Sequence, residues 1–60
     1  MDELKATIAK NLVELRNAAH LTQLQLAEKL NYSDKAVSKW ENGEAIPDIR
    51  VLIKLAELYN

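Results

Sequence analysis

Polar residues between positions 34 and 42 have side chains and a spacing suited to hydrogen bonding with a nucleic acid. On a helical wheel they fill one continuous arc of about 140°; they are Asp34, Lys35, Ser38, Lys39 and Asn42. All of them except Asp34 can donate a hydrogen bond. A helix that projects this arc from the protein could enter a DNA major groove, which is about 12 Å wide. An ordinary helical bundle also needs a polar face toward water, so a solvated surface is the alternative.

The residue types that catalysis or metal binding requires are scarce in this chain. It contains no cysteine and a single histidine, His20, so disulfides, thiolate metal sites and cysteine nucleophiles are excluded. There is no Gly-rich phosphate loop, and no pair of carboxylates stands at a plausible cleft position. The sequence therefore predicts no enzyme, no metal site and no cofactor, and we expect His20 to be a surface residue at a helix joint.

Length and composition predict one small helical domain, residues 1–60. A single Gly and a single Pro argue against a barrel or sandwich, which needs many turns. No apolar run approaches the ~20 residues of a membrane span, and residues 1–3 lack the basic start of a secretory signal, so we expect a cytoplasmic protein. The net charge of −1 is unusual for a nucleic-acid binder. Any binding to DNA must therefore depend on where the charges lie.

Two helices are predicted in the first half of the chain. The first spans about residues 3–19, with an apolar stripe expected to be buried: Leu4, Ile8, Leu12, Leu15 and Ala19. The second follows Thr22, which forms a capping box with Gln25, and it ends at Asn31. Its expected buried face comprises Leu26, Ala27 and Leu30.

Two further helices are predicted in the second half. The third runs over about residues 33–42, with Ser33 as its N-cap and Gly43 as its stop. Trp40 lies on its inner side, which favours a core residue over a platform for base stacking. Pro47 and Asp48 begin the fourth helix, whose expected core face is Ile49, Leu52, Ile53 and Ala56. Since this helix carries more apolar residues than one face needs, we expect part of it to contact a partner.

Residues 21–49 resemble the lambda-repressor-like family, also called the Cro/CI or xenobiotic-response-element type. The stretch reads L-T-Q-L-Q-L-A-E-K-L-N-Y-S-D-K-A-V-S-K-W-E-N-G-E-A-I-P-D-I, and its S-D-K-A-V-S-K-W-E segment is similar to many regulators of Gram-positive bacteria. The resemblance covers about residues 8–60. It implies an all-α, compact bundle of four or five short helices, in which helices two and three form a helix-turn-helix. The implied function is sequence-specific DNA binding by a transcriptional regulator, a repressor, whose third helix reads the major groove.

The resemblance also implies roles for individual residues. The residues that would contact bases are Lys35, Lys39, Ser38 and Asp34, and those that would contact the DNA backbone are Gln23, Ser33 and Asn42. Arg16 and Glu41 match a largely buried ion pair of the family that is structural. Other interpretations stay open, because Asp34 also suits the dipole at a helix start and Ser33 can serve as a cap alone. Gln23 can likewise be an ordinary residue of a first helical turn.

The implied partner is double-stranded DNA with a two-fold operator, bound by a homodimer whose half-sites lie ~34 Å apart. The family continues with a fifth helix after a segment like L-A-E-L-Y-N. We therefore expect either a fragment that lacks a C-terminal regulatory region or a chain that dimerises through its fourth helix. Leu24 replaces a usually polar residue of the family and is expected to be exposed. The alternative function is an antitoxin or another protein-interaction module of the same fold, with a toxin as its partner, which the low net charge and the surplus apolar surface favour.

Overall fold

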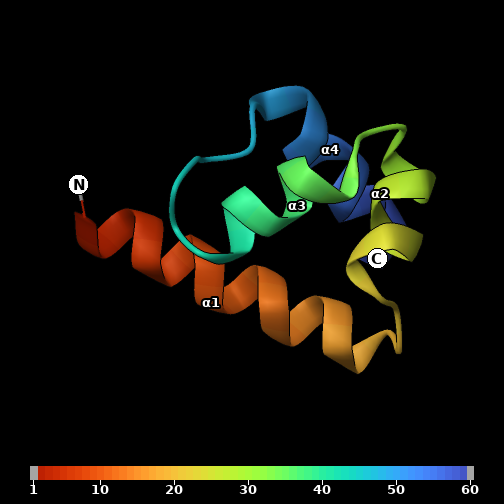
Figure 1. Cartoon of the computed structure of the whole chain (residues 1–60), viewed down its shortest axis with the longest axis horizontal. Helices are drawn as coiled ribbons and strands as arrows, with labels where there is room; N and C mark the ends of the chain where they lie inside the picture. The colour runs from red at the N-terminus through yellow and green to blue at the C-terminus, as the bar shows by residue number, and fades with distance from the viewer. Residues whose placement is uncertain (1, 60) are drawn as a thin grey trace.

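A computed structural model describes residues 2–59, which form four helices. In chain order these are α1 (Asp2–Ala18), α2 (Gln23–Leu30), α3 (Asp34–Glu41) and α4 (Ile49–Tyr59). Figure 1 shows α1 along one edge of the molecule, with the other three helices gathered on one side of it. The predicted all-α architecture is confirmed. Residues 1 and 60, the ends of the predicted domain, lie outside the described residues.

The buried face of α1 differs from the predicted stripe. Leu12 is buried and Ile8 is half-buried, but Leu4 and Leu15 are 50% and 44% exposed, and Ala19 is exposed as well. Ala9 is buried instead. The reason is that α1 packs mainly against α3, through a face turned from the predicted stripe toward Arg16.

Local signals set the ends of α2 as predicted. The Thr22 hydroxyl accepts a hydrogen bond from the Gln25 backbone N–H at 3.0 Å, and the Thr22 N–H donates to Gln25 Oε1 at 2.8 Å. At the other end Asn31 adopts the left-handed conformation, with φ 61° and ψ 40°, which asparagine tolerates better than most residues. The predicted buried residues Leu26, Ala27 and Leu30 are in the core.

The start of α3 also follows its predicted cap, while its end differs slightly. The Ser33 hydroxyl accepts from the Ala36 backbone N–H at 3.2 Å. The helix ends at Glu41, and Asn42 is its C-cap rather than its last residue. Gly43 follows with φ +82°, a conformation that favours glycine. Val37 and Trp40 are buried at 0% and 7% exposure, which confirms Trp40 as a core residue.

The predicted core face of α4 was wrong. Ile49, Leu52 and Ile53 are 72%, 42% and 54% exposed, and Ala56 is exposed too, whereas Val51 and Leu55 enter the core. Because apolar residues surround most of this helix, their spacing alone does not select the buried side, and α4 packs on α2 through the side that carries Val51 and Leu55. The start also differs, since Asp48 precedes the helix and accepts from the Val51 N–H at 3.1 Å.

One core joins the helices. Its buried members are Leu12, Leu26, Ala27, Leu30, Val37, Trp40, Val51 and Leu55. Within residues 2–59 no helix combines the length and the apolar character that crossing a membrane requires.

Candidate nucleic-acid interface

The turn between α2 and α3 is short and held by backbone hydrogen bonds. The Tyr32 N–H donates to the Ala27 carbonyl at 2.9 Å and the Asn31 N–H to the Glu28 carbonyl at 3.3 Å. The left-handed Asn31 reverses the chain at once, so only residues 31–33 separate the two helices. Since α2 and α3 also share the core, they form a helix-turn-helix in which α3 is fixed relative to α2.

The outer face of α3 presents most of the predicted base-contacting residues to solvent. Asp34, Lys35 and Lys39 are exposed, whereas Ser38 is half-buried. Val37 and Trp40 on the opposite side hold the helix in the core. The geometry therefore brings two exposed lysines and one exposed acid, with a half-buried hydroxyl, together on one face of α3.

The residues expected at the DNA backbone have partners within the protein. The Ser33 hydroxyl is the cap acceptor of α3. Asn42 donates through Nδ2 to Glu44 Oε1 at 3.1 Å and accepts from the Glu44 N–H at 3.1 Å. Gln23, the first residue of α2, donates through Nε2 to Glu41 Oε1 at 3.0 Å. Of these three side chains, Asn42 and Gln23 thus already use a donor.

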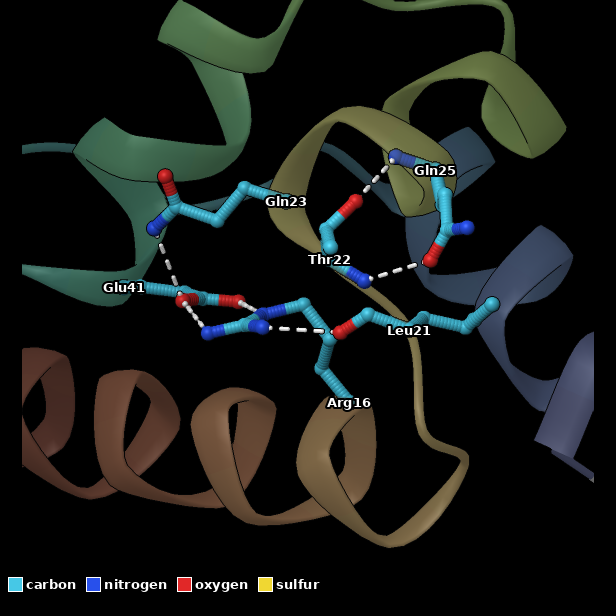
Figure 2. Close-up of polar contacts among 6 residues, drawn as sticks. All are labelled: Arg16, Leu21, Thr22, Gln23, Gln25 and Glu41. Atoms are coloured by element: carbon cyan, nitrogen blue, oxygen red, sulfur yellow. Dashed lines mark hydrogen bonds and ion pairs between the residues drawn. The ribbon is translucent and has the colours of Figure 1, made fainter.

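Arg16 and Glu41 form a two-point ion pair beneath the helix-turn-helix (Figure 2). Arg16 Nε lies 2.7 Å from Glu41 Oε2, and Nη2 lies 3.0 Å from Oε1. The two side chains are only 15% and 5% exposed. Arg16 Nη1 also donates to the Leu21 carbonyl at 2.9 Å. The pair therefore ties α1 both to α3 and to the joint that leads into α2.

Electrostatics around the pair favour the charged form of the arginine. The hydrogen bond to Glu41 raises the pKa of Arg16 above its usual value; burial opposes this, and the charge of Glu41 adds to it. Burial raises the pKa of the nearby Tyr59 phenol, and the charge of Glu41 acts in the same direction. Tyr59 thus stays neutral at physiological pH. Its hydroxyl is buried without a hydrogen-bond partner among the described residues.

Sequence reasoning missed two features near α3. The first is the hydrogen bond from Gln23 to Glu41. Sequence reasoning assigned Gln23 to a DNA contact and Glu41 to the structural ion pair, and no spacing pattern predicts a bond between them. A shallow groove of about 540 Å³ beside the end of α3 is lined in part by Lys5, Lys10 and Asn42. Lys5 lies about three helical turns before Arg16, on the same face of α1. This spacing could have predicted that Lys5 lies on the side of α1 that faces α3. Within residues 2–59, no His, Asp or Glu side chains cluster in threes or more as a metal site would need.

Comparison with known proteins gives one family. The helix-turn-helix family model matches residues 12–60. The HTH-type transcriptional regulator ImmR of Bacillus subtilis (strain 168) is 41% identical over 54 residues, covering 90% of this chain and 42% of ImmR. The HTH-type transcriptional activator BcrR of Enterococcus faecalis is 39% identical over 51 residues, covering 85% of this chain and 25% of BcrR.

A phage regulator is also similar. The cryptic phage CTXphi transcriptional repressor RstR of Vibrio cholerae is 34% identical over 50 residues, covering 83% of this chain and 45% of RstR. The chain thus spans less than half the length of each of these three relatives. No solved structure matches the chain significantly.

Proposed function

The chain belongs to the Cro/CI-type helix-turn-helix family of DNA-binding transcriptional regulators, and we propose that it recognises an operator by inserting α3 into the major groove. The observation that carries this proposal is the outer face of α3. Asp34, Lys35 and Lys39 are exposed on it, while Val37 and Trp40 fix the opposite side in the core. The lysines can therefore reach bases without any loss of packing.

The proposed base contacts follow from side-chain chemistry. Lys35 and Lys39 are one helical turn apart and can each donate to guanine O6 and N7. Asp34 can accept from cytosine N4, or it can stabilise the start of α3 through the helix dipole alone. Ser38, half-buried between the lysines, can contact only a base edge that comes close to the helix.

The proposed backbone contacts would fix the position of the domain on the duplex. Gln23 stands at the N-terminus of α2, where backbone N–H groups attract anions. Ser33 is the N-cap of α3, one position earlier relative to its helix than Gln23 is to α2, and its hydroxyl hydrogen is not used by the cap bond. Asn42 would have to exchange its bond to Glu44 Oε1 for one to a phosphate.

Repression is the regulatory outcome we propose. A domain that only occupies DNA can exclude RNA polymerase from a promoter, whereas activation needs an additional contact with the transcription machinery. The relative RstR is named a repressor, and BcrR is named an activator. The proposed activity implies a cytoplasmic location.

A homodimer is the proposed binding unit, with the exposed stripe of α4 as its interface: Ile49, Leu52, Ile53 and Ala56. This stripe continues into an apolar groove of about 310 Å³ between α1 and α4, lined in part by Leu15 and Leu52. Arg50 and Glu57 lie on one flank of the stripe, about two turns apart. Antiparallel pairing of two α4 helices would therefore place Arg50 of one copy beside Glu57 of the other.

The size of this surface limits the strength of such a dimer. A stable interface buries about 800 Å² on each partner, whereas the whole chain exposes 4251 Å². The stripe and the groove must both be covered to approach that area. We therefore propose a weak dimer in solution that becomes complete on DNA, where two half-sites bind both copies.

Selection of binding sites from a randomised DNA pool tests the proposed function. The expected result is an enriched two-fold sequence with half-site centres about one helical turn, ~34 Å, apart. Affinity for the enriched site should exceed affinity for random DNA by at least about 10³-fold at physiological salt. Equal affinity for both would remove the claim of sequence-specific binding.

A protein-interaction module, such as an antitoxin, is the second candidate function. The exposed apolar stripe of α4 and the net charge of −1 favour it. In that case a small partner protein should co-purify with the chain. Substitutions that introduce a charge into the stripe should abolish this association, whereas replacement of Lys35 and Lys39 in α3 should leave it unchanged.

A further inference from the structure

The carboxylate of Glu41 is shared between two side chains from different helices. Its Oε2 accepts from Arg16 Nε at 2.7 Å, and its Oε1 accepts from Arg16 Nη2 at 3.0 Å. The same Oε1 also accepts from Gln23 Nε2 at 3.0 Å. Glu41 therefore connects the ion pair under the helix-turn-helix with the first side chain of α2 (Figure 2).

The bond to Glu41 fixes which end of the Gln23 amide faces the protein. An ionised carboxylate can only accept hydrogen bonds, so the amide must turn its NH₂ group toward Glu41. Figure 2 shows Gln23 Oε1 pointing away from the carboxylate. One N–H of the planar NH₂ group is used, and the second N–H points in a different direction and remains available as a donor.

Arg16 allows the Glu41 carboxylate to lie close to the position proposed for a DNA phosphate. Alone, the negative charge of Glu41 would repel a DNA phosphate near Gln23. The guanidinium bonds both carboxylate oxygens, and both side chains are largely shielded from water, so the pair is close to neutral as seen from outside. The amide of Gln23 is thus held by the Glu41 carboxylate, whose negative charge is balanced by the guanidinium of Arg16.

We propose that Glu41 is a positioning residue for DNA binding, which orients the Gln23 amide so that its second N–H donates to a phosphate of the DNA backbone. This inference rests on the proposed function, because it requires that Gln23 contacts DNA. The new element is that the Gln23 amide already has its DNA-binding orientation in the free protein. Gln23→Ala removes none of the atoms that form the two hydrogen bonds between Arg16 and Glu41, so the positioning role and the structural role can be separated.

A double-mutant cycle on the selected DNA site tests the positioning. Gln23→Ala is introduced into the wild type and into an Arg16→Met/Glu41→Leu background, since apolar replacement of a complete buried pair is often tolerated. Ordering one side chain on binding corresponds to about a 2- to 10-fold loss in affinity. We expect Gln23→Ala to weaken binding by about that factor more in the wild type than in the double variant. An equal effect in both backgrounds would overturn the proposal.

Lys39→Ala in the same two backgrounds is the matched control. It should reduce affinity by the same factor in both, because the Lys39 side chain is not among the hydrogen-bond or ion-pair partners of Arg16 and Glu41 in residues 2–59. If Gln23→Ala has no effect in the wild type while Lys39→Ala weakens binding, the positioning role falls and the proposed function stands. If neither change alters binding, both fall.

A measurement on the free wild-type protein keeps the inference testable even if the double variant fails to fold. The side-chain NH₂ group of Gln23 should show restricted motion by NMR relaxation without DNA, and the same restriction in the complex. The side-chain amide of Gln25, which takes part in the exposed capping box, provides an internal comparison. Free rotation of the Gln23 amide before DNA is added would contradict the proposal.

Discussion

The ring of Tyr32 packs against the ring of Trp40, with centroids 5.5 Å apart and planes inclined at 60°. Tyr32 belongs to the turn after α2, and Trp40 lies in the last turn of α3. The contact therefore fastens the turn to the inner side of α3. Lys54 of α4 adds to this corner, because its Nζ lies 6.0 Å from the Tyr32 ring centroid and donates to the Leu30 carbonyl at 3.3 Å.

Replacing Tyr32 with alanine should therefore destabilise the domain. An aromatic pair contributes roughly 0.5–1.5 kcal/mol beyond the area it buries, so we expect the free energy of unfolding to fall by about 1–2 kcal/mol. Urea denaturation followed by circular dichroism measures this. Leu24→Ala is the control, because Leu24 is 55% exposed, and it should change stability by less than about 0.5 kcal/mol.

Removing Arg16 should unfold the domain. Arg16→Ala leaves Glu41 buried without its cation, and breaking one partner of a buried pair costs about 3–5 kcal/mol. This equals the stability that a single core gives a domain of this size. Circular dichroism at 25 °C should show loss of helix. Arg50→Ala removes an exposed 3.5 Å pair and should leave the fold intact; a folded Arg16→Ala protein that only loses DNA binding would contradict the structural role.

Lys35→Ala and Lys39→Ala should each weaken binding to the selected operator. Loss of a base contact corresponds to about 1–3 kcal/mol, with relaxed specificity at one base position. Fluorescence anisotropy against single-base variants of the operator measures both. Lys29→Ala removes the same charge from the last turn of α2 and should change affinity little. A similar loss for all three lysines would indicate attraction to DNA without sequence reading.

Ile53→Asp should disrupt the proposed dimer. The change places a charge in the centre of the exposed α4 stripe, so self-association measured by analytical ultracentrifugation should decrease and operator affinity should fall. Leu24→Asp is the matched control for self-association alone, because Leu24 and Ile53 are 55% and 54% exposed, whereas an acid beside Gln23 would itself repel DNA. Purely monomeric wild-type protein at high concentration, on and off DNA, would contradict the dimer.

Acid should weaken the start of α4. The hydrogen bond from the Val51 N–H, assisted by Arg50, lowers the pKa of Asp48 below its usual value. A depressed folded-state pKa means that the stabilisation is present above the unfolded-state pKa, about 3.9, and is lost as pH falls through the folded-state value. Thermal unfolding should be followed from about pH 6 to about pH 2, a range that includes the unfolded-state pKa of about 3.9. The melting temperature of Asp48→Asn should fall less over this range than that of the wild type. Identical curves would exclude Asp48 as a contributor.

Features that depend on residues close together in the chain could be predicted from the sequence. The Thr22–Gln25 capping box, the Ser33 cap and the left-handed Asn31 each act over a few residues, and each is present as predicted. The outer face of α3 could likewise be predicted, because Trp40 and Val37 are too apolar for the exposed side.

Features that depend on tertiary partners could not be read from spacing. In α4 the predicted core residues Ile49 and Ile53 are exposed, since only the place of α2 decides which apolar side is covered. The Arg16–Glu41 pairing followed from the family resemblance, and the bond from Gln23 to Glu41 spans 18 positions without any sequence pattern to reveal it.

The shortness of the turn at residues 31–33 leaves this domain without a hinge. Because α2 and α3 are joined by three residues and a common core, α3 cannot tilt relative to α2 unless hydrophobic contacts open. If the domain binds DNA as proposed, a change of operator preference must therefore come from the outward side chains, from bending of the DNA or from docking of the whole rigid domain, and the angle between α2 and α3 stays constant.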